Sequence, residues 1–192
     1  MKKIYPYIII LIFLPFLAIA QHPQQQRFFD ASNEVVLKLV GFDKDYDFRS
    51  DQFAGRFDQA QRRFEFIIPA ISVYPLNDPA DLSVFQDIFL ANTVDPNIYV
   101  TADFRENLVD MREFKSPTEM VLDGMLTIYN RHYNIPVVMS LFYSNEVLYY
   151  KLRMDLDLFH LNWSIPPHHR SFLTGIMQIQ VTDGKWSNLY KQ

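Results

Sequence analysis

The amino-acid sequence predicts an all-β domain, either a closed antiparallel barrel or a sandwich, with one short amphipathic helix. Apolar and polar residues alternate with a period of two in seven or eight separate segments. Aromatic residues make up 16% of the chain and only five glycines occur, a balance that favours strands. One segment, around residue 85, has the helical period instead. Many short strands and a single helix are typical of these two architectures.

The first twenty residues have the three parts of a cleavable secretory signal peptide. Met1-Lys2-Lys3 is followed by an apolar run from Ile4 to Leu17, and Ala18-Ile19-Ala20 supplies the small residues before the cleavage point. The run is shorter than the roughly 20 residues that a membrane-spanning helix needs, and Pro15 interrupts it. We therefore expect a periplasmic or secreted protein that begins at Gln21 and is not membrane-anchored.

After the signal peptide, we expect a polar leader over residues 21–27 and one barrel domain over 28–192. The chain has no cysteine, so it carries neither a disulfide nor a cysteine-linked lipid. The full sequence has a formal net charge of −4 and no basic run, and removal of two lysines with the signal peptide makes it more acidic. This balance argues against nucleic acid as a partner.

The strands are predicted from their alternating apolar positions. The segments before the helix are Val35 to Leu39, Phe53 to Phe57 and Phe64 to Ile68, and those after it are Ile98 to Phe104, Met120 to Ile128, Ile135 to Leu141, Leu148 to Leu158 and Ile176 to Val181. Residues 43–52 and 165–170 are predicted as loops, with hairpin turns near 58–60, 130–132 and 144–145 and a last turn at 183–184. Pro136 indicates a sheet edge or a bulge.

The helix is predicted over residues 79–91. Asn77-Asp78 offers a capping side chain, and Pro79 suits the first helical position. Leu82, Phe85, Ile88 and Phe89 then recur at helical spacing, which indicates an apolar stripe that covers the sheet as a lid or plug.

The sequence contains little that indicates catalysis, and we expect a protein that is not an enzyme and has no cofactor. It has no cysteine nucleophile, no Gly-x-Ser-x-Gly and no His-Glu-x-x-His. Asp155 and Asp157 share a strand face with charged neighbours, as on a solvated surface. His168 and His169 are adjacent but lack a clustered third ligand in the sequence, so we predict no metal site there. His160 is predicted to lie on a strand.

The apolar faces of the strands supply the candidate binding residues. An eight-stranded barrel is either filled by its own side chains or holds one small ligand, and the sequence leaves both open. The candidates that line this interior are Phe64, Phe66, Val137, Met139, Leu148, Tyr150, Leu152 and Met154.

The order of segments resembles that of the YceI-like family. Gly124-Met125-Leu126-Thr127-Ile128 followed by Ile135-Pro136-Val137 resembles the family's "G-x-L-T-I…P-V" hairpin, and residues 85–89 resemble its helical "F-F-D" segment. Residues 95–100 and 53–57 fit its "Y-P-x-I-x-F" and "G-x-F" strands, so that the resemblance covers residues 28–182. The glycine and threonine of the family's turn are absent from residues 130–136.

This resemblance implies an extended, lipocalin-like antiparallel barrel in the periplasm, with a tunnel for a long-chain apolar lipid such as a polyisoprenoid. Three alternatives remain open: a small outer-membrane barrel, a filled barrel that serves as an interaction module without ligand, and an enzyme that uses the aspartate or histidine pair. The oligomeric state is also open, and a homodimer is compatible with the sequence.

Overall fold

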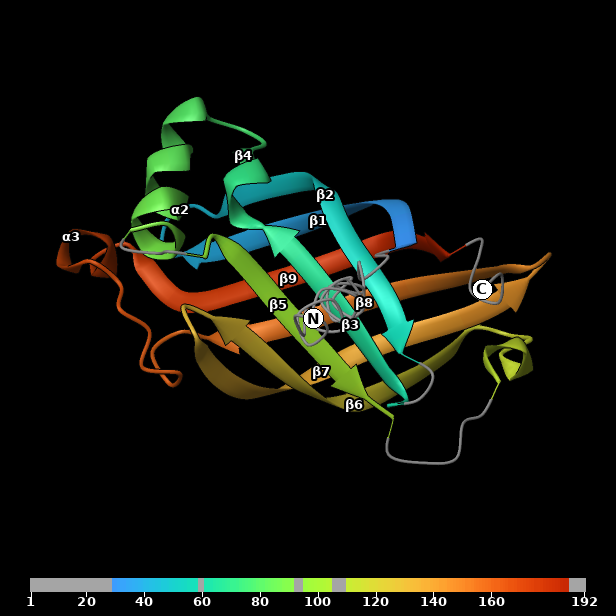
Figure 1. Ribbon diagram of the computed structural model, residues 1–192. Helices are drawn as coiled ribbons and strands as arrows, with labels where there is room; N and C mark the ends of the chain where they lie inside the picture. Colours follow the sequence, from blue (N-terminus) through green and yellow to red (C-terminus); the bar gives the residue numbers. More distant parts are fainter. Residues whose placement is uncertain (1–28, 59–60, 92–94, 105–109, 187–192) are drawn as a thin grey trace, which may run out of the picture.

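The computed structural model describes residues 29–58, 61–91, 95–104 and 110–186 (Figure 1). Eight long antiparallel strands form its main body: β1 (Phe29–Gly41), β2 (Tyr46–Asp58), β3 (Arg63–Pro69), β5 (Asn97–Asp103), β6 (Thr118–Ile128), β7 (Arg131–Ser144), β8 (Val147–Asp157) and β9 (Leu173–Trp186). The predicted signal peptide, the polar leader, residues 59–60 of the predicted hairpin turn and the C-terminal residues 187–192 lie outside the described residues.

The eight strands close into a barrel. Neighbouring strands follow the order β1-β9-β8-β7-β6-β5-β3-β2, and β1 also pairs with β2. The two-residue strand β4 (Tyr74–Pro75) adds to β2 only. Of the two architectures that the sequence predicted, the structure therefore has the barrel, as the resemblance implied.

The alternation of the strands sorts side chains between the interior and the solvent. Along β8, every second residue from Leu148 to Leu156 is buried, and the intervening Lys151, Arg153 and Asp155 are exposed. Within the described strands the buried polar side chains are Asn33 and Ser50, and neither carries a charge. An uncharged, apolar interior follows directly from the period-two pattern.

The helix forms where it was predicted, with a 3-10 first turn. The turn η2 (Pro79–Asp81) leads into α2 (Leu82–Phe89). The Asp78 side chain accepts a hydrogen bond of 2.9 Å from the backbone N–H of Ala80, as expected of a capping residue. Val84, Phe85, Ile88 and Phe89 are buried, so α2 covers the barrel with its apolar face.

The short helices lie at the two ends of the barrel. Figure 1 shows α2 and α3 (Pro167–Arg170) at the same end, on the left, and the 3-10 turn η3 (Met111–Glu113) at the opposite end. We call the end with α2 and α3 the α2 end, and the end with η3 the far end. A further 3-10 turn, η1 (Ala70–Ser72), follows β3. Among the described residues, no helix is long and apolar enough to cross a membrane.

The predicted loop over residues 43–52 is wrong in its second half, because β2 begins at Tyr46. Tyr46, Phe48 and Ser50 point inward, while the charges between them point to solvent. Arg49 on this outer face forms an ion pair of 2.7 Å with Glu34 of β1. The many charged residues in this segment suggested a loop, although they alternate with inward residues as in a strand that has one exposed face.

Three smaller predictions also need correction. The last strand does not close at residues 183–184 but continues to Trp186. His160 lies in an exposed turn after β8 and not on a strand. The predicted loop at 165–170 contains the helical turn α3. The edge predicted from Pro136 is confirmed, because β7 pairs with β8 only from Val138 onward and leaves Pro136 beside β6 alone.

Candidate functional site

All eight candidate residues point into the barrel, six from the neighbouring strands β7 and β8 and two from β3, which β5 and β6 separate from β7. None has more than 2% of its surface exposed. The candidates are Phe64 and Phe66 on β3, Val137 and Met139 on β7, and Leu148, Tyr150, Leu152 and Met154 on β8. Because these side chains have almost no exposed surface, the interior around them is filled in this structure.

Aromatic rings fill the far end of the barrel. The ring of Trp186 stacks on Tyr150 at a centroid distance of 4.2 Å and on Phe64 at 4.9 Å. Phe66 lies 5.9 Å from the same tryptophan. Three of the eight candidates are therefore parts of one aromatic cluster that closes this end.

A polar pair is buried within this cluster. The Nδ2 atom of Asn33 donates a hydrogen bond of 2.7 Å to the Tyr150 hydroxyl, and the Asn33 Oδ1 atom accepts one from the backbone N–H of Lys185. Burial raises the pKa of Tyr150, because the phenolate would lose its hydration. The pair stays neutral and fixes the tyrosine ring against β9.

The middle of the barrel is aliphatic and rich in sulfur. Met139 pairs with Leu152 across β7 and β8, and Met154 pairs with Ile179 across β8 and β9. Val137 lies one inward position from Met139. Methionine side chains are flexible and fit irregular apolar shapes, so this is the part of the interior that can most readily adapt to a chain-like ligand.

A second aromatic layer lies at the α2 end. Phe85 and Phe89 of α2 stack at 4.8 Å, and Trp163 lies 5.2 Å from Phe89. Tyr129 and Trp163 each donate a hydrogen bond of 3.2 Å to the backbone carbonyl of Ile88. Carbonyls in the last turn of a helix lack intrahelical partners, and these two donors therefore fasten α2 to the barrel.

A cleft of about 340 Å³ opens at the α2 end. Its lining combines aromatic side chains of the barrel rim with residues at the end of α2 and in the loop after β8: Asp87, Ile88, Ala91, Tyr129, Arg131, Tyr133, Trp163, Ser164 and Pro166. Its size falls at the lower end of the range for small-molecule sites. The cleft borders Ile88, Tyr129 and Trp163, the residues whose contacts hold α2 in place.

A polar cluster lies on the side of α2 that faces α3. The Asp87 Oδ2 atom is 3.0 Å from the Nε2 atom of His169 and 3.4 Å from that of His168. These contacts lower the pKa of Asp87, chiefly through the hydrogen bond with His169. The absence of a third ligand, on which the prediction of no metal site rested, thus does not hold in the folded chain.

The other candidates for catalysis do not converge. Asp155 and Asp157 are exposed on the outer face of β8, and Asp155 pairs with Arg153 at 2.7 Å. Their placement on a solvated sheet surface agrees with the interpretation from the sequence.

Two important interior residues, Trp186 and Asn33, were missed by the sequence reasoning. A bulge in β9 places two residues opposite Lys151, since Tyr150 pairs with Gly184 while Leu152 pairs with Val181. The bulge shifts the inward alternation by one residue, so that Trp186 falls on the wrong parity for a series read from Val181. The sequence did not predict that Asn33 is buried, because an asparagine before a strand is typical of a turn.

The comparison with solved structures finds similar barrels at low sequence identity. They include a polyisoprenoid-binding domain from Saccharophagus degradans implicated in plant cell wall breakdown, with a TM-score of 0.64, 10% identity and coverage of 82% of this chain and 96% of that chain. BcnA of Burkholderia cenocepacia has a TM-score of 0.58 and 14% identity over 79% of this chain and 96% of that chain. The YceI protein of Campylobacter jejuni has a TM-score of 0.50 and 16% identity over 97% of this chain and 99% of that chain.

No protein-family model matches the sequence. No curated protein matches it either. The likeness is therefore one of three-dimensional structure, and it agrees with the resemblance in segment order. The chain has the fold of the YceI-like, lipocalin-like barrels.

Proposed function

We propose that the protein is a divergent YceI-like barrel of the bacterial cell envelope that binds one long-chain apolar lipid, of which a polyisoprenoid is an example. The observation that carries the proposal is the interior itself, whose described strands bury no charged side chain. A lipid chain is bound through the removal of its methylenes from water, worth about 0.8 kcal/mol for each buried CH₂. The solved barrel from Saccharophagus degradans is a polyisoprenoid-binding domain, which supports the same ligand class here.

We place the entrance at the α2 end. The far end is closed by stacked rings around Trp186, whereas the α2 end has the cleft beside Ile88 and Trp163. A chain that entered there would pass Phe85 and Phe89 and reach the adaptable middle around Met139 and Leu152. Because those residues are fully covered in this structure, ligand uptake requires α2 and the side chains beneath it to move.

A filled barrel without ligand is the second candidate, and a specific observation favours it. Val137 and Met139 have no exposed surface, Met154 has 1% and Leu152 has 2%. In a barrel that never opens, these side chains would keep such low exposed fractions at all times. Such a barrel would act through its outer surface.

The exported location forms part of the proposal. From Lys151 to Asp157 the outward positions of β8 are charged, and its inward positions are apolar, which suits a barrel surrounded by water. The first twenty residues have the parts of a signal peptide. A binding role outside the cytoplasm needs no catalytic group. It also fits the position of Asp155 and Asp157 on the solvated outer face of β8.

Leu152→Trp tests the proposal, with Lys151→Trp as a matched control on the opposite face of the same strand. If the interior opens to accept a chain, the indole at position 152 occupies the ligand's space. Uptake of a fluorescent long-chain fatty acid should then fall at least several-fold, while the control binds like the wild type. Melting temperatures of all three proteins are measured in parallel.

The same pair of measurements distinguishes the second candidate. In a permanently filled barrel, the larger ring overpacks the core and destabilises it by about 1–3 kcal/mol. A sharp fall in the melting temperature of Leu152→Trp, combined with no probe uptake by the wild type, would contradict lipid binding and support the filled barrel.

A further inference from the structure

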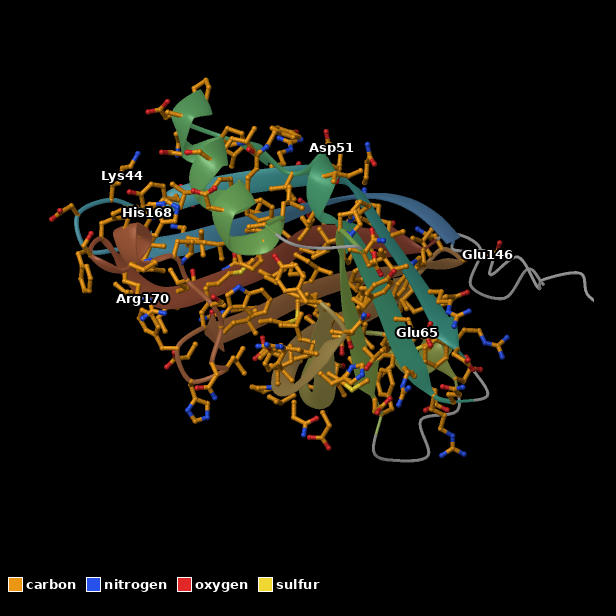
Figure 2. The ribbon with its side chains drawn as sticks, turned by 60° about the vertical axis from the view of Figure 1, so that its left-hand side comes forward. Lys44, Asp51, Glu65, Glu146, His168 and Arg170 are labelled. Atoms are coloured by element: carbon orange, nitrogen blue, oxygen red, sulfur yellow. The ribbon has the colours of Figure 1, made fainter. Side chains whose placement is uncertain are left out.

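The Asp87, His168 and His169 side chains gather at the α2 end from two elements far apart in the sequence. One ligand atom from each residue lies within 4.8 Å of those from the other two. Figure 2 shows His168 at this end, on the same side of the molecule as Lys44 and Arg170, while Glu146 lies toward the far end. The cluster therefore forms only when α2 and α3 are both in place.

The two distances from the Asp87 carboxylate suit a tetrahedral metal as well as they suit hydrogen bonds. With zinc bond lengths of about 2.0–2.1 Å, two ligand atoms on a tetrahedron lie roughly 3.3 Å apart. The two observed separations from the Asp87 Oδ2 atom, 3.0 and 3.4 Å, bracket that value. The two imidazole rings are 4.0 Å apart between centroids, and the three ligand atoms lie within 4.8 Å of one another, so a rotation of the exposed His168 ring would bring them around one centre.

The choice of ligands indicates which metal would bind. Two imidazoles and one carboxylate suit zinc and its neighbours in the first transition row, whereas magnesium and calcium prefer oxygen ligands alone. His169 is almost covered, while His168 and Asp87 are substantially exposed. A bound ion would thus have protein on one side and a position for water on the other.

We propose that Asp87, His168 and His169 bind one Zn²⁺ ion that joins α3 to α2. This inference does not depend on lipid binding, because the three ligands lie outside the barrel interior. The metal would add a direct link between the two helical segments at the α2 end, in place of two hydrogen bonds to one carboxylate oxygen.

The surroundings of His169 limit the strength of the site. Its Nδ1 atom is buried and has no hydrogen-bond partner among the described residues, and the ring rests edge-on against Phe172 at 5.3 Å. Metal-bound histidines usually donate from the second nitrogen, and loss of such a partner weakens binding by about 10–100-fold. We therefore expect reversible binding that is measured by titration, and not an ion that survives every purification step.

The test is a calorimetric titration of the tag-free, chelator-treated protein with Zn²⁺ at neutral pH. Asp87→Asn and His168→Ala remove ligands from exposed positions, so their folding is not at risk. The control replaces the other three histidines of the sequence, His22, His132 and His160, with alanine. Titration with Co²⁺ gives an independent readout, since its visible absorption reports the geometry of the bound ion.

The wild type and the control are expected to bind one Zn²⁺ per chain with equal affinity. Each ligand variant should bind at least about tenfold more weakly and lose the visible Co²⁺ spectrum of the wild type. Equal Zn²⁺ affinity in the wild type and both ligand variants would overturn the proposal, as would loss of binding in the control or no binding by the wild type.

Discussion

Asn33 and Tyr150 are 117 residues apart in the sequence, yet their side chains share a hydrogen bond of 2.7 Å inside the barrel. The bond links the start of β1 with β8, and the second contact of Asn33, to Lys185, extends it to β9. Three neighbouring strands are thus held in register by one asparagine. The same contact orients the tyrosine ring on which Trp186 stacks.

Tyr150→Phe should destabilise the protein although it keeps the aromatic ring. The change leaves the buried Nδ2 group of Asn33 without its acceptor, which costs about 1–3 kcal/mol. Tyr149→Phe on the outer face of β8 is the control, and surface changes of this kind usually stay within about 0.5 kcal/mol. Urea unfolding measures both. Equal losses for the two variants would show that the buried contact adds nothing.

Gly184→Ala should destabilise the far end through a steric clash. A Cβ atom at position 184 would lie 2.3 Å from the Cζ atom of Tyr150, and two other ring carbons would be within 2.5 Å. Overpacking of this kind costs about 1–3 kcal/mol. The same change in a Tyr150→Leu background should cost clearly less, because the ring is gone; equal costs in both backgrounds would place the strain elsewhere.

Above pH 10, the stability of the wild type should fall partly through Tyr129. Burial raises the pKa of Tyr129 from 10.0 to about 12 in the folded protein. The unfolded chain therefore releases this proton at a lower pH than the folded protein does. The contribution of protonated Tyr129 to the free energy of unfolding is fully present below pH 10 and is lost as the pH rises toward about 12.

Tyr129→Phe removes this titration and also the hydrogen bond to Ile88. The variant should be less stable than the wild type at neutral pH, and the difference should shrink as the pH rises above 10. Urea unfolding across this pH range measures the effect. Curves that stay parallel would contradict the assignment to Tyr129.

The mature protein should begin at Gln21. Ala18 and Ala20 supply the small residues that signal peptidase recognises, and the apolar run before them has the length of a signal peptide. N-terminal sequencing of the protein from the periplasmic fraction decides the point. An intact Met1 on that protein would refute cleavage.

Most of the barrel could be predicted because one simple signal, alternation, determines both the strands and their inward faces. Leu148, Leu152 and Met154 were assigned to the interior on that basis, and the structure places them there. The helix was equally clear, since Asp78 and Pro79 mark its start and the stripe around Phe85 its buried face.

The parts that could not be predicted depend on contacts between distant segments. The bulge in β9 that turns Trp186 inward lies beside Gly184, and the Asp183-Gly184 pair is equally typical of a turn, which is how it was interpreted. The approach of Asp87 to His168 and His169 spans more than 80 residues and requires the closed barrel. Whether the interior is open depends on how completely the side chains fill its volume, and the pattern of residue types does not indicate this.

Mass spectrometry of an organic extract from the natively exported, purified protein measures directly whether the barrel binds a lipid. We expect a long-chain apolar lipid at close to one molecule per chain, which is reduced several-fold in Leu152→Trp and unchanged in Lys151→Trp. Extracts from the wild type that contain no lipid above the level found with an unrelated exported protein would contradict it.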